Sequence, residues 1–404
     1  MKLFLLIDEI KKLVLLYKSD LIRYIYIILI PIIAFTLESS LHLDLILTIL
    51  LTSIMFIPLA KSIGDSTEDI AVYYSDTVAS LLKVTLGNTA EIIIAIIAIS
   101  EGGLADLVKA SIIGSILANI LFIFGLSLVA GGLKRKDQFF NKENTGLYAT
   151  MLLIAISGLA VPTVLSNTLL KPDNTDNMTR IAILSDVVAL VLLGVYLASI
   201  VFTFVTHRDV FILKIGNEHV PQQQLQQGSE RHDKYQQRHQ QHEEEITEHP
   251  KLWTKKKSFV TLGLSMIAVA IVGEVLINSI KLETEEFGLG QFFVGAIIIG
   301  VVSNAPKHIG AITHARKGEM EMSIGIAAGS GTQIALFVVP TLIIAGIIMG
   351  KPFTLVFSIF ELVAVFFASL ILNLIAHDGK SNWFEGIMLI AVYLIIAAGF
   401  LVIR

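Results

Sequence analysis

The 404-residue sequence contains no cysteine and few charged residues. The absence of cysteine excludes a disulfide framework and any metal site built from thiolates. Charged residues make up 16% of the chain, against about 25% in soluble proteins. The net charge of −4 is small for this length, and no basic surface indicates nucleic-acid binding. With 54% hydrophobic residues and a mean hydropathy of +0.75, the chain is expected to be a multi-pass integral membrane protein.

Long apolar runs fill most of the sequence. Because about 20 apolar residues cross the hydrocarbon core of a bilayer, we predict eleven spans, six before a polar stretch and five after it. They lie near residues 21–38, 43–61, 70–101, 105–131, 145–166, 178–206, 258–281, 285–316, 320–349, 352–377 and 381–403. The predicted fold is an all-α polytopic membrane protein with about eleven transmembrane helices.

The polar residues divide the chain into predicted parts. These are an amphipathic N-terminal segment (1–20), a first transmembrane half (21–206), a linker rich in His, Gln and Glu (207–257) and a second transmembrane half (258–404). Basic residues in the short loops of one side predict a cytoplasmic N-terminus and a cytoplasmic linker; they include Lys134, Arg135, Lys136, Arg316 and Lys317. The linker could bind a divalent metal or sense pH, or it could be a solvated tether.

Two matching stretches, Gly87-Asn88-Thr89-Ala90-Glu91 and Ser303-Asn304-Ala305-Pro306-Lys307, lie inside apolar runs of the two halves. A run rich in Gly and Ser follows each at a similar distance: Gly114 comes 23 positions after Glu91, and Gly329 comes 22 after Lys307. By the predicted span count, the first stretch runs from inside to outside and the second runs in the opposite direction. Such an inverted repeat is typical of secondary transporters with a site near the membrane midplane.

Glu91 and Lys307 form the predicted centre of a transport site, because a charge inside a bilayer persists mainly where it lines a polar path or meets a partner. A hard cation such as Ca²⁺ takes about six to eight oxygen ligands, carboxylates included. Glu91 supplies a carboxylate; its alternative is a neutral carboxyl that neighbouring amides satisfy. The amide side chains that could offer further oxygens are Asn88, Asn304, Asn119 and Gln333.

These motifs resemble the calcium/proton antiporters of the cation/calcium exchanger superfamily. The resemblance also covers Ser66-Thr67-Glu68-Asp69-Ile70-Ala71, Gly131-Gly132-Leu133, Thr206-His207, Ile324 to Ser330 and Asp378 to Gly386. It implies an exchanger in which two inverted repeats, each with a Gly-Asn-x-x-Glu motif, hold the cation. It further implies that Asn88 and Glu91 are cation ligands, that Glu91 also carries the proton, and that the supporting polar groups are Ser115, Asn119, Ser330 and Gln333. We predict Asn304 as a third cation ligand.

The second motif departs from the family pattern. Where the family has Gly-Asn-Ala-Ala-Glu-His, this chain has Ser303 to His308, with Lys307 in place of the second carboxylate. Lys307 could lock Glu91 in a salt bridge, or it could release its proton and so couple one cation to one proton. A third reading is a lysine that snorkels toward the interface. His308 is either a proton relay or a packed histidine, and Glu361 is expected to have a structural or supporting role.

The sequence therefore predicts a cation/proton antiporter, with calcium/proton exchange favoured. The alternatives are a monovalent cation/proton exchanger and a non-transporting relative locked by the pair of Glu91 and Lys307. No resident cofactor is expected, and the expected partners are the transported cation, protons and the lipid bilayer. No zinc-protease motif of the form His-Glu-x-x-His is present, and we do not expect an enzyme.

Overall fold

The computed structural model describes residues 22–36, 45–74, 76–169, 175–206, 254–286 and 290–402. Within these residues, eight helices are long and apolar enough to cross a membrane. The number is nine if the bent pair Gln291–Val302 and Ala305–Lys317 is one span. The structure is thus almost entirely helical, as predicted. The predicted N-terminal segment 1–20 and most of the linker 207–257 lie outside the described residues.

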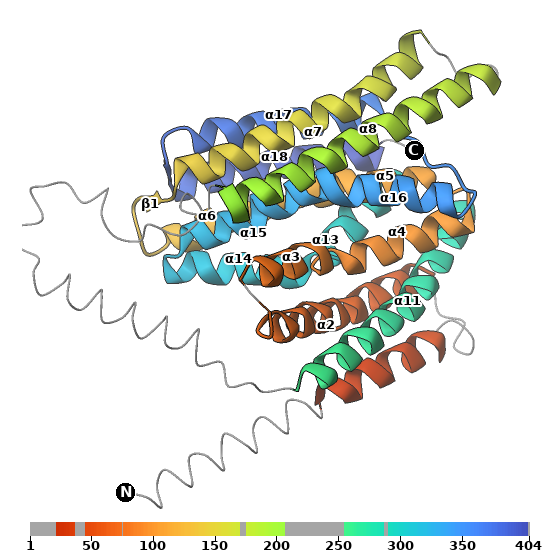
Figure 1. Ribbon diagram of the computed structural model, residues 1–404, viewed down its shortest axis with the longest axis horizontal. Helices are drawn as coiled ribbons and strands as arrows, with labels where there is room; N and C mark the ends of the chain where they lie inside the picture. The colour runs from red at the N-terminus through yellow and green to blue at the C-terminus, as the bar shows by residue number, and fades with distance from the viewer. Residues whose placement is uncertain are drawn as a thin grey trace, which may run out of the picture.

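The helices of both halves form one bundle (Figure 1). The first half contains a helix at Ile22–Thr36, α2 (Leu45–Ala71), α3 (Asp76–Leu86), α4 (Thr89–Glu101), α5 (Ala105–Leu117), η1 (Ala118–Ile123), α6 (Phe124–Gly132), α7 (Lys142–Thr168), α8 (Thr175–Val201) and η2 (Phe202–Thr206). The second contains α11 (Lys255–Glu286), α12 (Gln291–Phe293), η4 (Val294–Ile299), α13 (Gly300–Val302), α14 (Ala305–Lys317), α15 (Met320–Gln333), η5 (Ile334–Val338), α16 (Val339–Ile348), α17 (Ile359–Ala376) and α18 (Trp383–Val402). Elements named η are π-helical turns.

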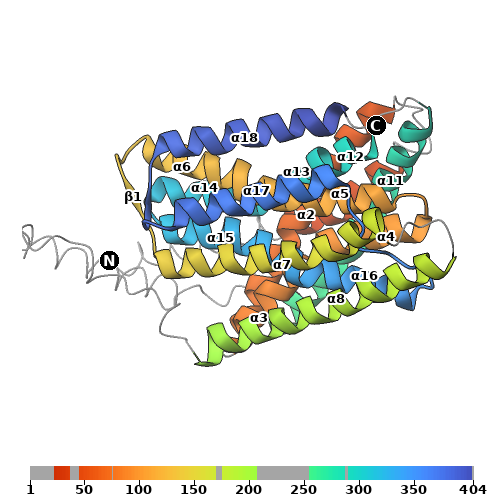
Figure 2. The same cartoon turned by 90° about the horizontal axis from the view of Figure 1, so that it is seen from above.

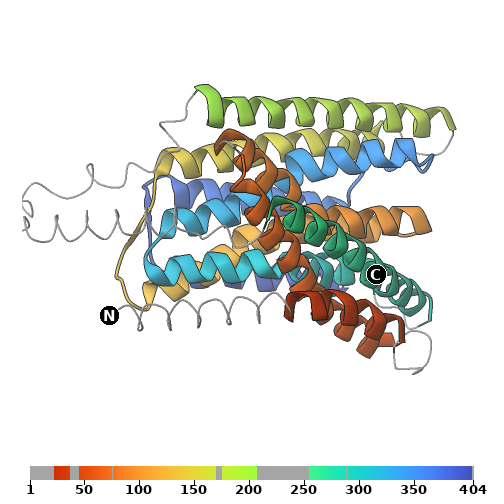
Figure 3. The same cartoon turned by 60° about the horizontal axis from the view of Figure 1, so that its bottom comes forward.

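The continuous helix α5–η1–α6 lies at the centre of the bundle. In the most apolar stretch of this helix, 83% of the residues are buried, against 28% in α8 and 22% in α18. Helices α8 and α18 lie at opposite edges in Figure 2. The pair α2 and α11 pack against each other and cross the other helices at an angle (Figure 3). Side chains on α5 are therefore well placed to meet residues from both halves.

Small residues bring the two halves into close contact along α5. A Cβ atom added to Gly114 would lie 2.0 Å from the carbonyl oxygen of Ala296 in η4, and one added to Gly300 would lie 2.8 Å from the backbone of Gly114. Glycine lets membrane helices approach this closely. The contact places Asn304, the N-cap residue of α14, beside Ser115 near the C-terminal end of α5.

The two matching stretches are breaks between helices. Leu86 ends α3 and Thr89 begins α4, while Val302 ends α13 and Ala305 begins α14 after a bend of 55°. The predicted spans 70–101 and 285–316 are thus each interrupted near the middle. Non-helical backbone at membrane depth is tolerated where it is enclosed by protein or lines a cavity.

The two ends of the bundle are built differently. At one end, the short strands β1 (Gln138–Phe139) and β2 (Lys380–Ser381) pair antiparallel. Near them, Arg135 donates to the carbonyl oxygen of Lys317 at 2.9 Å. At the other end, the Gln291 amide donates to the carbonyl oxygen of Gly103 at 3.3 Å, and the Lys351 ammonium donates to the carbonyl oxygen of Ser100. We refer to these as the β end and the Gly103 end.

The chain between α16 and α17 enters the bundle in a non-helical conformation. Residues 351–358 form no helix, although Phe353, Leu355 and Phe357 are buried. Thr163 of α7 donates to the Leu355 carbonyl oxygen at 3.1 Å and accepts from the Phe357 N–H at 3.0 Å. The predicted span 352–377 is therefore helical only from Ile359, which places the first turn of α17 inside the protein.

Candidate cation site

The ammonium group of Lys307 is surrounded by three side-chain oxygens. Its Nζ atom lies 2.8 Å from Asn88 Oδ1, 2.9 Å from Glu91 Oε1 and 3.0 Å from Asn304 Oδ1. A lysine ammonium has three N–H donors, so each donor has an acceptor. The side chains of Lys307 and Glu91 are 22% and 9% exposed. The structure thus brings Glu91 and Lys307, the predicted centre of the site, together with the predicted ligands Asn88 and Asn304.

Helix starts determine this arrangement. Glu91 and Lys307 are both the third residue after an N-cap asparagine, Asn88 for α4 and Asn304 for α14. An N-cap side chain normally accepts a hydrogen bond from the first turn of its helix, but neither asparagine does so. Both amide oxygens instead accept hydrogen bonds from Lys307.

The amide nitrogens of the two asparagines hold these oxygens in place. Asn88 Nδ2 donates to Gln333 Oε1 at 3.1 Å. Asn304 Nδ2 lies 3.3 Å from each of three acceptors, Ser115 Oγ, the Gly300 carbonyl oxygen and Ser303 Oγ. Because the nitrogen of each amide is engaged on one side, its oxygen points toward the ammonium group. Gln333 and Ser115 therefore join the site through the asparagines.

The side chains of three predicted residues are not among the hydrogen-bond partners of this group. Asn119 is fully buried, and neither atom of its amide has a hydrogen-bond partner among the described residues. His308 is also buried, and its Nε2 atom has no partner within that part of the chain. Ser330 is buried on α15. Asn119 lies in the π-helical turn η1, a feature that often marks functional positions.

Glu91 lines a small cavity. Glu91 Oε2 is buried and has no hydrogen-bond partner among the described residues. The cavity has room for about one water molecule, and its polar lining comes from Ser111, Ser115 and Ser303. Sequence reasoning did not assign Ser111 or Ser303 to the site. The signal for Ser303 was present, since it replaces the glycine of the family motif.

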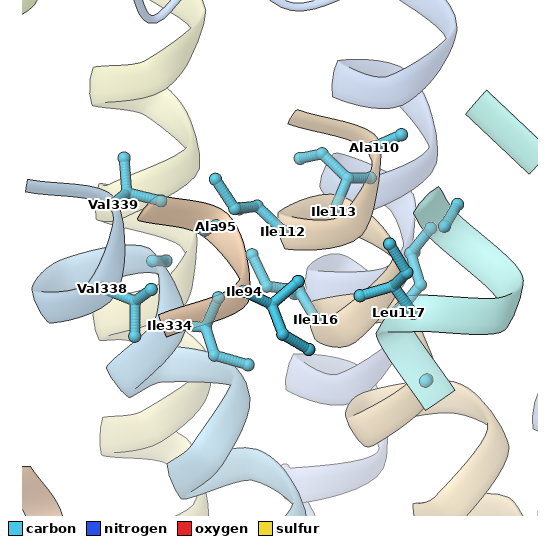
Figure 4. Close-up of a cluster of buried hydrophobic side chains, with 14 of the residues drawn as sticks. Ile94, Ala95, Ala110, Ile112, Ile113, Ile116, Leu117, Ile334, Val338 and Val339 are labelled. Atoms are coloured by element: carbon cyan, nitrogen blue, oxygen red, sulfur yellow. The ribbon is translucent and has the colours of Figure 1, made fainter. Parts of the chain in front are cut away.

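An apolar layer lies on the side of this cavity nearer the Gly103 end. It includes Ile94, Ala95, Ile112, Ile334 and Val338, which approach one another from α4, α5 and the helix that contains η5 (Figure 4). Ile94 and Ala95 come later than Glu91 in α4, and Ile112 comes earlier than Ser115 in α5. These three residues therefore lie between the site and the Gly103 end. The layer covers Glu91 on this side in the present conformation.

The site contains a single carboxylate. Among the residues that the structure describes, no three His, Cys, Asp or Glu side chains are placed together to hold a metal ion. The oxygens of Asn88, Glu91 and Asn304 suit a cation, but Lys307 now occupies the position between them. In this conformation the site is electrically balanced by its own lysine.

Comparisons of the sequence identify the family. Residues 45–205 and 257–402 match the family described as "Sodium/calcium exchanger protein". The chain is 39% identical over 363 residues to a Ca²⁺/H⁺ antiporter of Aphanothece halophytica, with 89% of this chain and 91% of the relative covered. It is 35% identical over 351 residues to the Ca²⁺/H⁺ antiporter ChaA of Bacillus subtilis, with 86% and 90% covered.

Solved structures agree with this assignment. The structure of native YfkE, a Ca²⁺/H⁺ antiporter, superposes with a TM-score of 0.72 at 29% identity, covering 94% of this chain and 100% of that one. The H⁺/Ca²⁺ exchanger CAX shares the fold, with a TM-score of 0.62 at 16% identity, and 96% and 93% are covered. The predicted resemblance is thus confirmed, and the chain is a membrane transporter that belongs to the sodium/calcium exchanger family.

Proposed function

We propose that this protein is a cation/proton antiporter, with Ca²⁺ as its principal cargo, in which the Lys307 ammonium occupies the cation position between transport events. The family and its Ca²⁺/H⁺ antiporter relatives support the exchange activity. The three oxygens around Lys307 Nζ support the assignment of the ammonium group to the cation position. This single arrangement carries the proposal, because the same oxygens are the cation ligands that the sequence predicts.

Exchange then requires the ammonium to leave its oxygens. A cation that approaches Asn88, Glu91 and Asn304 is repelled by a charged lysine at the same place. If Lys307 releases its proton and its side chain turns away, the oxygens are free and Glu91 keeps its negative charge. One cation therefore enters for each proton that leaves Lys307. With two carboxylates, a site could instead release two protons for each Ca²⁺.

This difference has a consequence for the membrane potential. Exchange of one Ca²⁺ for one proton moves one net positive charge in each cycle, whereas exchange of one monovalent cation for one proton moves none. Transport of Ca²⁺ would therefore respond to the potential by about 2.3 kcal/mol per charge for each 100 mV. A monovalent cargo is the alternative that the single carboxylate favours.

The finer architecture belongs to the same proposal. We infer about eleven spans in two repeats of opposite orientation, with α4 and α14 as the corresponding half-helices, joined by a cytoplasmic linker. Both half-helices begin at the site, so their positive dipole ends lie there. The β end, with Arg135 and Lys317, would face the cytoplasm because basic loops stay on that side. In alternating access, the apolar layer near the Gly103 end would open, and the helices would close over the site near the β end.

A second candidate is a non-transporting relative. The observation that favours it is that all three donors of Lys307 are satisfied, one of them by an ion pair at 2.9 Å. Breaking such a pair leaves an uncompensated buried charge, which costs about 3–5 kcal/mol. In this candidate, Lys307 never leaves Glu91 and no cation crosses.

Proton flux in sealed liposomes tests the proposal. Purified protein is reconstituted with an internal pH dye and an imposed proton gradient, and Ca²⁺, Na⁺ and K⁺ are added in turn. We expect proton movement on addition of Ca²⁺ that E91Q abolishes and that E385Q, a matched change at another first-turn glutamate, leaves intact. Silence of the wild type with every ion, beside an active relative, would support the locked protein.

A further inference from the structure

A second buried acid lies apart from Glu91. Glu361, in the first turn of α17, is fully buried. Its Oε2 atom accepts a hydrogen bond from the Ser358 N–H at 2.7 Å, and its own N–H donates to Ser358 Oγ at 3.1 Å. The other oxygen, Oε1, is buried and has no hydrogen-bond partner in the described part of the chain. Helix capping thus accounts for one oxygen of Glu361 and leaves the other unexplained.

A buried lysine lies near this acid. Lys109 of α5 is 11% exposed and pairs with Asp106 Oδ1 at 3.3 Å, while Asp106 is 57% exposed. Helix α5 packs against α17, and the two charged residues of α5, Lys109 and Asp106, both act electrostatically on Glu361. The three residues therefore form a series that runs from the surface near the Gly103 end to the interior.

Other charged groups lie away from Glu361. Among the described elements with the most extensive contacts to α17, η1 has no charged residue. The charged residues of α7 and β2 lie at the β end, where the C-terminus of α17 is held by the hydrogen bond from Phe140 N–H to the Gly379 carbonyl oxygen; they are Lys142, Glu143 and Lys380. The charges that face Glu361 are therefore those of Lys109 and Asp106.

We propose that Lys109 exchanges partners between Asp106 and Glu361, and that Glu361 is a second proton-binding residue of this protein. A neutral Glu361 can stay buried without a counter-ion, which leaves Lys109 with Asp106 as in this structure. When Oε1–H gives its proton to water at the Gly103 end, the new carboxylate takes Lys109 as its ion-pair partner. An intramembrane acid persists where it has such a role and such a partner.

The change of partner by Lys109 links two helices, α5 and α17. Lys109 lies six residues before Ser115 on α5, and Glu361 fixes the start of α17. A change of partner would alter the contact between these helices close to the apolar layer over Glu91. Only the effect of this proton on transport rests on the proposed antiport function. Lys109 can change its partner, and Glu361 can bind a proton, without any cation transport.

Infrared difference spectroscopy of the purified protein in lipid tests the inference. Protonated carboxyl groups absorb separately from carboxylates, so a pH titration reports the midpoint of each buried acid. We expect a carboxyl signal that is lost in E361Q. Glutamine can still serve as the third residue of a capping box, so the variant keeps the helix start. The matched control is E385Q, because both oxygens of Glu385 have partners, Ser381 and Asn382.

Two further variants should move the midpoint of this signal in opposite directions. K109M removes the counter-ion of the carboxylate and should raise the midpoint by about one pH unit or more. D106N frees Lys109 for Glu361 and removes a negative charge, so it should lower the midpoint. Since Asp106 is mostly exposed, D106N gives a result even if K109M fails to fold.

Three results would overturn the inference. They are an unchanged carboxyl signal in E361Q, shifts of the same sign in the two variants, and no shift in D106N. These signals do not depend on ion flux. A protein that carries no cation could still show them, and an active exchanger could lack them, so this inference and the proposed function can fail separately.

Discussion

Glu91 and Lys307 occupy the same position in two different half-helices and meet as an ion pair. Each is the third residue after an N-cap asparagine, and Oε1 of the acid lies 2.9 Å from Nζ of the lysine. The family pattern has an acid at both positions. With Lys307 in place of the second acid, the three oxygens surround an ammonium group of the protein itself in this structure.

K307E should turn this site into one that binds Ca²⁺ more tightly. The change removes the competing ammonium and restores a second carboxylate among the oxygens of Asn88, Glu91 and Asn304. We expect Ca²⁺ affinity to rise by at least about tenfold, which corresponds to about 1.4 kcal/mol. Isothermal titration calorimetry on purified protein measures this, with K317E at the end of α14 as the control for added charge. An affinity no higher than that of the wild type would contradict the assigned cation position.

The protein should be more stable with both charges of the pair of Glu91 and Lys307, or with neither, than with only one of them. E91Q leaves the Lys307 ammonium without its counter-ion, whereas E91Q/K307Q removes both charges. A buried pair that loses one partner is destabilised by about 3–5 kcal/mol, while removal of both is often nearly neutral. The melting temperature should therefore fall in E91Q and recover in the double variant. Equal melting temperatures would indicate that Lys307 reaches solvent instead of Glu91.

Q333A should lower the cation affinity of the site, although Gln333 is placed as a support of Asn88 and not as a cation ligand. Gln333 Oε1 accepts a hydrogen bond from the Asn88 amide nitrogen at 3.1 Å. Its loss lets the amide turn and costs about 1 kcal/mol, or roughly a fivefold loss in cation affinity. The control is Q291A, which removes a glutamine that contacts a loop carbonyl at the Gly103 end. Equal cation affinities in Q333A and Q291A would show that Gln333 does not support the cation site.

G114A should disrupt the contact between the two halves. Its Cβ would lie 2.0 to 2.4 Å from the backbone of Ala296, and backbone cannot move aside as a flexible side chain can. Overpacking of this kind costs about 1–3 kcal/mol or more. G325A is the matched control, because nothing lies within 4 Å of the added atom. We expect a lower melting temperature and lower cation affinity for G114A alone.

The sequence predicted the helical membrane fold and the central residues because these leave strong local signals. Apolar runs predict helices directly, and the matching motifs placed Glu91 opposite Lys307. The breaks at Asn88 and Asn304 could not be located from apolarity alone, since the residues on both sides are apolar. The non-helical chain at 351–358 was missed for the same reason: its buried Phe353, Leu355 and Phe357 suit a membrane helix equally well. Tertiary hydrogen bonds with Thr163 hold this segment in its non-helical conformation.

The partners of individual polar groups were less predictable. Glu361 was expected to have a structural or supporting role, and its capping of α17 fits the structural part of that expectation. The unpartnered Oε1 atom depends on the packing of α5 against α17, which no local pattern reveals. The same holds for Ser111, whose place beside Glu91 follows from the depth at which the two halves meet.

The number of protons released when Ca²⁺ binds tests the central claim most directly. Calorimetry of Ca²⁺ binding to the purified wild type, repeated in buffers with different ionisation enthalpies, gives this number at each pH. If Lys307 must give up its ammonium proton to admit the cation, about one proton is released per ion, and K307Q releases none from this position. Binding of Ca²⁺ to the wild type without proton release, at a pH where the lysine is charged, would contradict the account.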